Sequence, residues 1–590
     1  MRRHLVLTVM RLLGVACFVF ALGSCTPTGL SQPEGPSGWI DKPGWQSKRF
    51  MVATTNPLAT DAGYQTLKAG GSAVDAAIVV QMVLTLTEPQ SSGIGGGAFM
   101  LHYDGNTVKS FDGRETAPAE IDEALFLKTN GDPMAFLDAV TGGRSVGTPG
   151  VLRMLELAHQ QYGRLPWASL FDPAIRLAEN GFAMSARLHA LLASETRLKN
   201  DPVALAYFYN FNGTPKAVGT LLKNPALAAT LRQIARKGAG ALYTGDIARD
   251  IINKVRNHPT NPGRLSQGDL VRYRAKERAP ICVVYHQRYD VCGMAPPSAG
   301  AITIGEILGV LERTDIERYR PTRVGSSWRL APEAVHLYTE AARLAYADRN
   351  VYIADADYAP VPLSLLDKNY LARRAALIGG KSLNVAEPGV PSGAKINLGQ
   401  DDSREFFSTS HISIVDGQGN AVTMTTSIED AFGARLMVRG FLLNNQLTDF
   451  SFTPTQNGKP VANRAQAGKR PRSSMAPTFV FDRTNRQLLL VIGSPGGPSI
   501  INYVAKVIIG TLDWKLGVQD AIALPNFGSR NGPTELEKGF ANDELIEALK
   551  ARGHNVRVVD QTSGLQGILR IPSGWSAGAD PRREGTARGD

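Results

Sequence analysis

The pattern of polar and apolar residues over positions 408–427 predicts a β-hairpin. Polar and apolar side chains alternate from Thr409 to Val415, which is the two-residue period of a half-buried strand. The turn-rich sequence Asp-Gly-Gln-Gly-Asn follows, and the residues after it are again typical of a strand. If Val415 pairs with Ala421 across this loop, Ser427 faces Thr409 on the same side of the sheet.

A second pattern predicts a buried helix that begins after Ser72 and ends near Leu86. Ser72 is a typical N-cap, and the apolar residues that follow cover all sides of the helix. A glycine-rich run at 93–97 comes after this helix and precedes a strand-like segment. That order is the reverse of a dinucleotide-binding loop, and no Gly-Lys-Ser/Thr follows, so we expect no phosphate site there.

The N-terminus has the pattern of a targeting segment. Two arginines precede an apolar run, and Leu-Gly-Ser-Cys, ending at Cys25, resembles the lipobox of bacterial lipoproteins. We therefore interpret residues 1–24 as a lipoprotein signal peptide, Cys25 as the lipidation site and residues 25–50 as a linker. A membrane-spanning helix is the alternative, but Arg11 interrupts the run. Thr26 after the cysteine favours lipid anchoring to the outer membrane, on its periplasmic side, in a Gram-negative bacterium.

Composition favours a large enzyme over a small binding module. The chain has 590 residues, 43% of them hydrophobic, and can bury a large core. Its formal charge is +11, but lysines and arginines are spread among acids, so we expect no nucleic-acid partner. We expect a solvated loop for the basic run 469–472 and a mobile tail from Arg582 onward.

Two cysteines remain outside the N-terminal segment, Cys282 and Cys292. They lie in two β-rich halves around a turn near Gln287, which places them opposite each other. The oxidising periplasm makes a disulfide plausible, and two free buried thiols are the alternative. No cysteine–histidine spacing indicates a zinc site, and we expect no metal.

Thr409 is the candidate nucleophile, because a cut before it would give one residue both a hydroxyl and a free α-amine. The amine, with a pKa of roughly 8, can act as the base for the hydroxyl beside it. An ordinary hairpin is the alternative. His411 lies on the same strand face, and we expect it to be a structural neighbour. The sequence Gly-Trp-Ser-Ala-Gly at 574–578 fits the nucleophile elbow of the α/β-hydrolases. That fold places its catalytic histidine after the serine, but the last histidine of this chain is His554, so this motif is excluded.

The sequence resembles the γ-glutamyltranspeptidases, a family of N-terminal-nucleophile hydrolases. Eight motifs in the family's order carry the resemblance: 89–99 (PQSSGIGGGAF), 112–118 (DGRETAP), 147–150 (GTPG), 294–300 (MAPPSAG), the Thr409 strand, 443–450 (LNNQLTDF), 469–475 (KRPRSSM) and 493–497 (GSPGG). It implies an α+β fold, a four-layer αββα sandwich built from both products of self-cleavage. Residues 51–408 would form the large subunit and 409–590 the small catalytic subunit.

The resemblance also implies a mechanism that needs no cofactor. The chain would cut itself between Ser408 and Thr409, and mature Thr409 would attack the γ-carbonyl of glutathione or a related γ-glutamyl amide. Ser427 would hold the nucleophile's hydroxyl, and Gly496 and Gly497 would bind the oxyanion through backbone N–H groups. The γ-glutamyl ester would then pass to water, an amino acid or a dipeptide.

Six further residues would recognise the amino-acid head of the substrate. Arg114, Ser473 and Ser474 suit its α-carboxylate, because a guanidinium and two hydroxyls are donors. Asp449, helped by Gln446 and Glu429, suits its α-ammonium.

The chain departs from the common family pattern at two places. Glu429 stands where many members have asparagine, and it could either repel the α-carboxylate or strengthen amine binding. The segment between Asp449 and Lys469 is shorter than in well-known bacterial members and lacks tyrosine, so the family's lid would be reduced or absent.

A cephalosporin or glutaryl acylase of the same fold is the nearer alternative function, although Arg114 together with Asp449 argues against it. A non-catalytic lipoprotein scaffold is the more distant one.

Overall fold

The computed structural model describes residues 34–35, 37–325, 327–394, 397–401 and 408–590. The expected signal peptide and the expected lipidation site, Cys25, lie outside the described residues. Within the described part of the chain, no helix has the length and apolar character needed to cross a bilayer.

The predicted hairpin forms the centre of the first large sheet, and its register is the expected one. Ser410 pairs with Thr426 and Val415 with Ala421, so Thr409 and Ser427 come next in the same register. All pairings in this sheet are antiparallel. Its strands, in spatial order, are β25 (Thr586–Gly589), β2 (Met51–Thr54), β12 (Ser410–Val415), β13 (Ala421–Ser427), β3 (Gly97–Tyr103), β4 (Val108–Asp112) and β7 (Lys276–Arg278).

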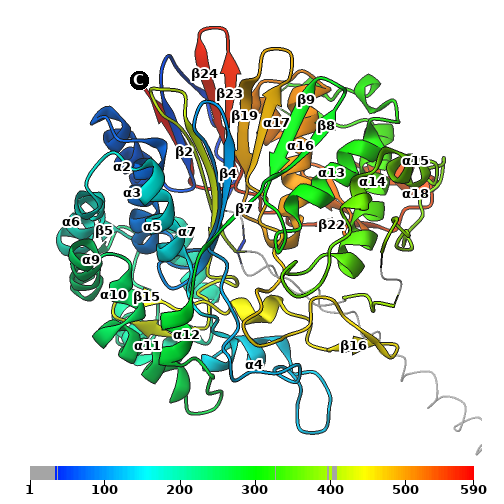
Figure 1. Ribbon diagram of the computed structural model, residues 1–590. Helices are drawn as coiled ribbons and strands as arrows, with labels where there is room; N and C mark the ends of the chain where they lie inside the picture. The colour runs from blue at the N-terminus through cyan, green and yellow to red at the C-terminus, as the bar shows by residue number, and fades with distance from the viewer. Residues whose placement is uncertain (1–33, 36, 326, 395–396, 402–407) are drawn as a thin grey trace, which may run out of the picture. The chain divides into compact units, whose positions relative to one another are not determined.

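A second antiparallel sheet packs against the first, face to face (Figure 1). Strands β12 and β13 of the first sheet contact its strands β19 and β23. In spatial order the strands are β1 (Trp45–Ser47), β24 (Gly574–Ala579), β23 (Gln566–Ile571), β19 (Gln487–Gly493), β18 (Thr478–Asp482), β9 (Tyr289–Gly293) and β8 (Ile281–Tyr285).

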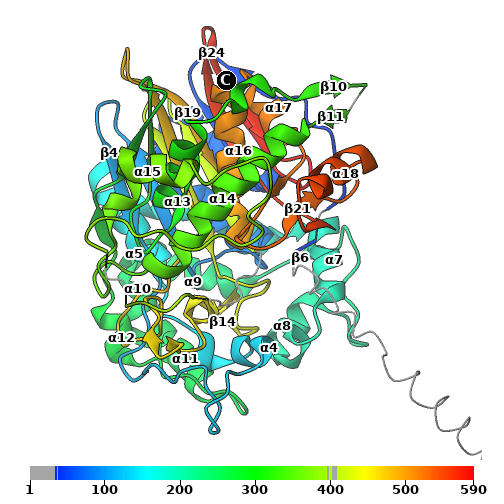
Figure 2. The same ribbon diagram turned by 90° about the vertical axis from the view of Figure 1, so that its right-hand side faces the viewer.

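Helices cover the outer face of each sheet, which gives the predicted αββα sandwich (Figure 1). The expected helix after Ser72 is α3; Ser72 accepts from the backbone N–H of Asp75, whose carboxylate accepts from Ser72 in return. The first sheet is covered by α2 (Pro57–Lys68), α3 (Ala73–Thr87) and α5 (Val151–Tyr162). The second is covered by α13 (Gly300–Leu311), α14 (Pro332–Tyr352), α16 (Ile500–Leu512) and α17 (Val518–Ala523). Figure 2 views the molecule from the side of α14.

The alternation in the central strand follows from these layers. Ile412 and Ile414 are buried in the core that includes α3. His411 and Ser413 face the other sheet, where Ser413 Oγ donates to the backbone oxygen of Gln566 on β23. Thr409 has the same parity as His411 and Ser413, so it too belongs to the face between the two sheets.

Shorter elements complete the chain, and α10, α11 and α12 lie below the sheets in both views (Figures 1 and 2). The remaining helices are α4 (Phe136–Val140), α6 (Asp172–Asn180), α7 (Ala186–Ser194), α8 (Pro202–Phe208), α9 (Pro225–Lys237), α10 (Gly240–Tyr243), α11 (Gly245–Arg256), α12 (Gln267–Arg272), α15 (Lys368–Ala375) and α18 (Asp543–Ala551). The small sheets contain β5 (Phe182–Ala183) with β6 (Leu221–Leu222), β10 (Thr322–Val324) with β11 (Ser327–Arg329), β14 (Met437–Val438) with β15 (Phe441–Leu442), β16 (Thr455–Gln456) with β17 (Lys459–Pro460), and β20 (Phe527–Gly528) with β21 (Thr534–Glu537) and β22 (Val556–Val559).

Two expectations about exposed segments are wrong. In the described part of the expected linker, 25–50, β1 pairs with β24 and Glu34 is fully buried. The expected mobile tail forms β25, which pairs with β2, and Arg582 is buried beside Glu537 and Asp580. The expected basic loop at 469–472 is buried, because distant acids neutralise its arginines.

Cys282 on β8 and Cys292 on β9 are directly opposed and joined by a disulfide. Their sulfur atoms lie 2.02 Å apart. The cross-strand placement is the one that the turn near Gln287 predicts.

Candidate active site

Thr409 and Ser427 face each other across the end of the central hairpin. The Thr409 hydroxyl donates to Ser427 Oγ at 3.3 Å, and both residues are buried. Thr409 has a backbone φ of +132°, a region that a β-branched residue rarely adopts. The strained residue is the one that follows the expected cleavage bond, and local strain of this kind is often found where a chain reacts.

The predicted site residues surround one small cavity of about 30 Å³. Every residue expected to act on or bind the substrate lines it, except Gly496, whose neighbour Gly497 does. The lining residues are Arg114, Thr409, Ser427, Glu429, Gln446, Asp449, Ser473, Ser474, Met475, Gly497 and Ile500. Within the described part of the chain, no residue between Asp449 and Lys469, where we expect a reduced or absent lid, lines the cavity.

Arg114 is buried behind the cavity and held in one orientation. Its guanidinium pairs with the Asp449 carboxylate and donates to the backbone oxygens of Pro471 at 3.1 Å and Arg472 at 2.8 Å. Gln446 Nε2 also donates to Asp449, at 2.9 Å. The cavity therefore has a fixed cation and a fixed anion side by side.

Glu429 lies next to this ion pair, and its environment favours the neutral carboxylic acid. Burial and the charge of Asp449 raise the pKa of Glu429 well above its usual range. Its carboxyl group accepts from Asn445 Nδ2, and its backbone N–H donates to Ser427 Oγ at 2.8 Å. Glu429 thus connects the central hairpin to the residues that carry the charges.

Gly497 lines the cavity, and Gly496 precedes it in the chain. Gly496 has φ +132°, and a Cβ there would lie 2.6 Å from the Tyr503 ring, so the position favours glycine. Gly497 begins a 3₁₀ turn, Gly497–Ser499, that continues directly into α16. Backbone N–H groups at the start of a helix attract negative charge, as an oxyanion hole requires.

The two serines come from the other sheet, just before β18. Ser474 Oγ accepts from the guanidinium of Arg349 at 2.6 Å, and Ser473 pairs through its backbone with Pro297 at 2.9 Å. The predicted site residues did not include Arg349, Asn445, Met475 or Ile500. No local signal marks Arg349, because α14 also carries other charged residues that are buried, Glu340, Arg343 and Asp348.

The histidines have structural surroundings. Burial lowers the pKa of His411 to about 3, and its ring contacts Thr425 at 2.9 Å and Ser413 at 3.1 Å. Ser576 lies inside strand β24. A nucleophile elbow would need it on a turn between a strand and a helix.

A separate buried group holds His336, Glu340 and His554, with potential ligand atoms within 4.8 Å of one another. Their ring nitrogens already have protein partners: the two rings bond each other at 2.8 Å, and the outer nitrogens reach Gly379 and Thr534. These hydrogen bonds occupy the nitrogens that would otherwise bind a metal ion.

Comparisons with known proteins agree on a family. A model of that family, described as Gamma-glutamyltranspeptidase, matches residues 59–589. The chain is 35% identical to the "Glutathione hydrolase proenzyme" of Escherichia coli (strain K12), over 96% of this chain and 97% of that protein. It is 32% identical to the "Acylase ACY 1 proenzyme" of Pseudomonas sp. (strain SE83), over 90% and 91%. Among solved structures, cephalosporin acylase from Bacillus halodurans is similar, with a TM-score of 0.80 at 27% identity over 93% and 97% of the two chains.

Proposed function

Because the chain belongs to the γ-glutamyltranspeptidase family, we propose that it is a self-processing γ-glutamyltransferase that hydrolyses glutathione and related γ-glutamyl compounds. The observation that carries this proposal is the single cavity in which Thr409 and the Arg114–Asp449 pair meet. A nucleophile beside one fixed cation and one fixed anion suits an amide that ends in a free amino-acid head.

Maturation begins at the bond between Ser408 and Thr409. The Thr409 hydroxyl attacks the Ser408 carbonyl, the C–N bond breaks as the nitrogen takes a proton, and an ester remains. Water hydrolyses the ester, which leaves a carboxylate on Ser408 and a free amine on Thr409. The products are a large subunit that ends at Ser408 and a small subunit that starts at Thr409, held together as a heterodimer.

Turnover then uses the new N-terminus. The α-amine of Thr409 takes the proton of its own hydroxyl, and the oxygen attacks the γ-carbonyl of the substrate. The N–H groups of Gly496 and Gly497 stabilise the oxyanion, and Ser427 orients the nucleophile. The leaving amine departs with a proton, and water, an amino acid or a dipeptide takes the γ-glutamyl group from the ester.

Substrate selection comes from the charged residues. Arg114, Ser473 and Ser474 bind the α-carboxylate, while Asp449, Gln446 and Glu429 bind the α-ammonium. An acylase is the second candidate, favoured by the similarity to a cephalosporin acylase and by the absence of lid residues from the described cavity lining. It would not need Asp449, because a glutaryl head has no ammonium group.

Two experiments test the proposal. Purified wild-type protein gives two fragments on a denaturing gel, and N-terminal sequencing of the smaller one starts at Thr409. The Thr409→Ala variant stays uncut; normal maturation of that variant rules out the assignment. A γ-glutamyl anilide is hydrolysed, faster with glycylglycine, whereas preferred hydrolysis of the glutaryl anilide favours the acylase.

We also propose that the protein is anchored by a lipid on Cys25 to the periplasmic side of the outer membrane. The lipobox-like sequence before Cys25 supports this location. The Cys25→Ala variant is then expected to leave the membrane fraction, or to keep its signal peptide, while a Cys282→Ala control stays membrane-bound.

A further inference from the structure

Glu34 carries a buried charge that contacts Ser408, the residue before the expected cleavage bond. Its side chain is fully buried, although the residue lies in the stretch that follows the N-terminal segment. One carboxylate oxygen, Oε2, faces Arg187 Nη2 at 2.8 Å and Arg583 Nη1 at 2.7 Å. Burial opposes the charged form, but the two arginines outweigh it and lower the pKa of Glu34.

The other carboxylate oxygen binds two serine hydroxyls. Ser408 Oγ donates to Oε1 at 2.9 Å, and Ser91 Oγ donates to it at 2.5 Å. Because Oε2 is held by both arginines, the direction of Oε1 is fixed. The side chain of Ser408 and the carbonyl that Thr409 would attack share one Cα, so this hydrogen bond restricts where the scissile peptide can lie.

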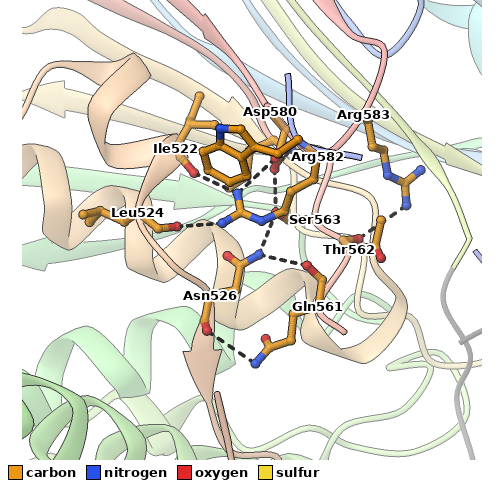
Figure 3. Close-up of polar contacts among 12 residues, drawn as sticks. Ile522, Leu524, Asn526, Gln561, Thr562, Ser563, Asp580, Arg582 and Arg583 are labelled. Carbon is orange, nitrogen blue, oxygen red and sulfur yellow. Dashed lines mark hydrogen bonds and ion pairs between the residues drawn. The ribbon is translucent and has the colours of Figure 1, made fainter. Parts of the chain in front are cut away.

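The arginines are themselves held in place from two distant parts of the chain. Arg187 lies on α7 and also donates to the backbone oxygen of Gly35 at 2.8 Å. Arg583 follows Arg582, and the two side chains point to opposite sides, Arg582 toward Asp580 and Leu524 and Arg583 toward Thr562 (Figure 3). The ionic contacts of Arg582 fix the segment from which Arg583 reaches Glu34.

We propose that Glu34 is a positioning residue for self-cleavage, which holds Ser408 in the geometry that Thr409 attacks. This inference depends on the proposed self-processing. Glu34 does not line the substrate cavity, so it serves maturation rather than turnover. After the cut, its contact with Arg583 links the fragment that ends at Ser408 to the small subunit.

The test follows cleavage of freshly made precursor over time, by cell-free synthesis and gel analysis. Ser408→Ala removes the hydroxyl but leaves the ionic cluster intact, and we expect cleavage about tenfold slower, since a positioned charge-assisted hydrogen bond is lost. Glu34→Gln slows cleavage by a similar factor. The double variant is no slower than either single one, because both remove the same contact.

Ser91→Ala is the matched control, because its hydroxyl binds the same oxygen from a residue outside the cleavage bond. Its precursor is expected to mature within about twofold of the wild-type rate. Glu34→Gln enzyme that has been cut is expected to hydrolyse the γ-glutamyl anilide with wild-type kcat per cut chain.

The outcomes separate this inference from the proposed function. Normal cleavage of Ser408→Ala overturns the role of Glu34 but leaves self-processing intact. If Glu34→Gln is cleaved slowly but Ser408→Ala is cleaved at the wild-type rate, the role of Glu34 in positioning is also overturned, because its charge would then serve only folding. A wild-type chain that is never cut overturns both.

Discussion

Replacement of Asp449 by asparagine isolates the proposed recognition of the substrate's α-ammonium. Asparagine has the same shape and keeps an oxygen that can accept from Gln446 and Arg114. Arg114 retains its two backbone acceptors, at 3.1 and 2.8 Å. The substitution therefore removes one negative charge and little else from the cavity.

The size of the effect follows from the burial of the carboxylate. The Asp449 side chain is 13% exposed, so a bound ammonium group would be largely removed from water. Loss of one partner from a buried, hydrogen-bonded charge pair costs about 2–4 kcal/mol. At about 1.4 kcal/mol per factor of ten, kcat/KM for a γ-glutamyl substrate falls roughly 30- to 1000-fold.

The assay compares γ-glutamyl-p-nitroanilide with glutaryl-p-nitroanilide. The two compounds share the carboxylate, the chain length and the leaving group, and differ in the α-ammonium alone. For Asp449→Asn we expect kcat/KM to fall for the first and to stay within about threefold for the second. The ratio of the two constants therefore isolates the ammonium contact from any general damage to the site.

Glu429 provides an internal check, because Asp449 contributes to its raised pKa. Removal of Asp449 favours ionisation of Glu429, which would partly replace the lost charge. The double variant Asp449→Asn/Glu429→Gln should therefore lose more γ-glutamyl activity than Asp449→Asn. Parallel loss of both substrates in Asp449→Asn would refute the reasoning, because Asp449 would then support the nucleophile and not the ammonium.

Three further predictions concern other groups. Joint replacement of Cys282 and Cys292 by serine should lower the free energy of unfolding in urea by about 2–3 kcal/mol, since the disulfide closes a short loop with a separation of 10 residues. His411→Asn should leave the acid limb of the kcat/KM profile in place, because burial lowers the pKa of His411 to about 3 and the ring stays neutral during turnover. Burial raises the pKa of Glu115 to about 8, so this side chain becomes negatively charged beside Arg114 above that pH. KM for the γ-glutamyl anilide should therefore rise above that pH, and Glu115→Gln should abolish the rise.

The central hairpin was predictable because its information is local. The loop between Val415 and Ala421 sets the register, and the register decides that Ser427 faces Thr409. A two-residue period leaves no freedom about which residues share a face. The buried helix after Ser72 was predictable for a similar reason, since its cap and its apolar run are adjacent in sequence.

The buried charges were not predictable, because their partners are far away in the sequence. Arg582 looks like part of a solvated tail until Glu537 and Asp580 surround it. Arg583 pairs with Glu34 at the other end of the chain. A local pattern of arginines predicts exposure in general, since an unpaired charge is costly to bury. Only the fold reveals that the acids needed to pair with them are present.

The charges of the cavity also bear on the proposed role of Glu429, which stands where asparagine is common in the family. A charged Glu429 would repel the α-carboxylate, but burial and Asp449 favour its neutral form, and Asn445 donates to it. Burial likewise favours the neutral form of Glu115 behind Arg114. The ion pair that lines the cavity is formed by Arg114 and Asp449, one of each sign. Such a pair complements an amino-acid head, which carries one of each as well. A glutaryl head carries a carboxylate alone. When that carboxylate pairs with Arg114, Asp449 loses its partner, and the substrate offers no ammonium group in its place. The balance of charge therefore supports the proposed preference for γ-glutamyl over glutaryl substrates, even though the similar acylases share the fold.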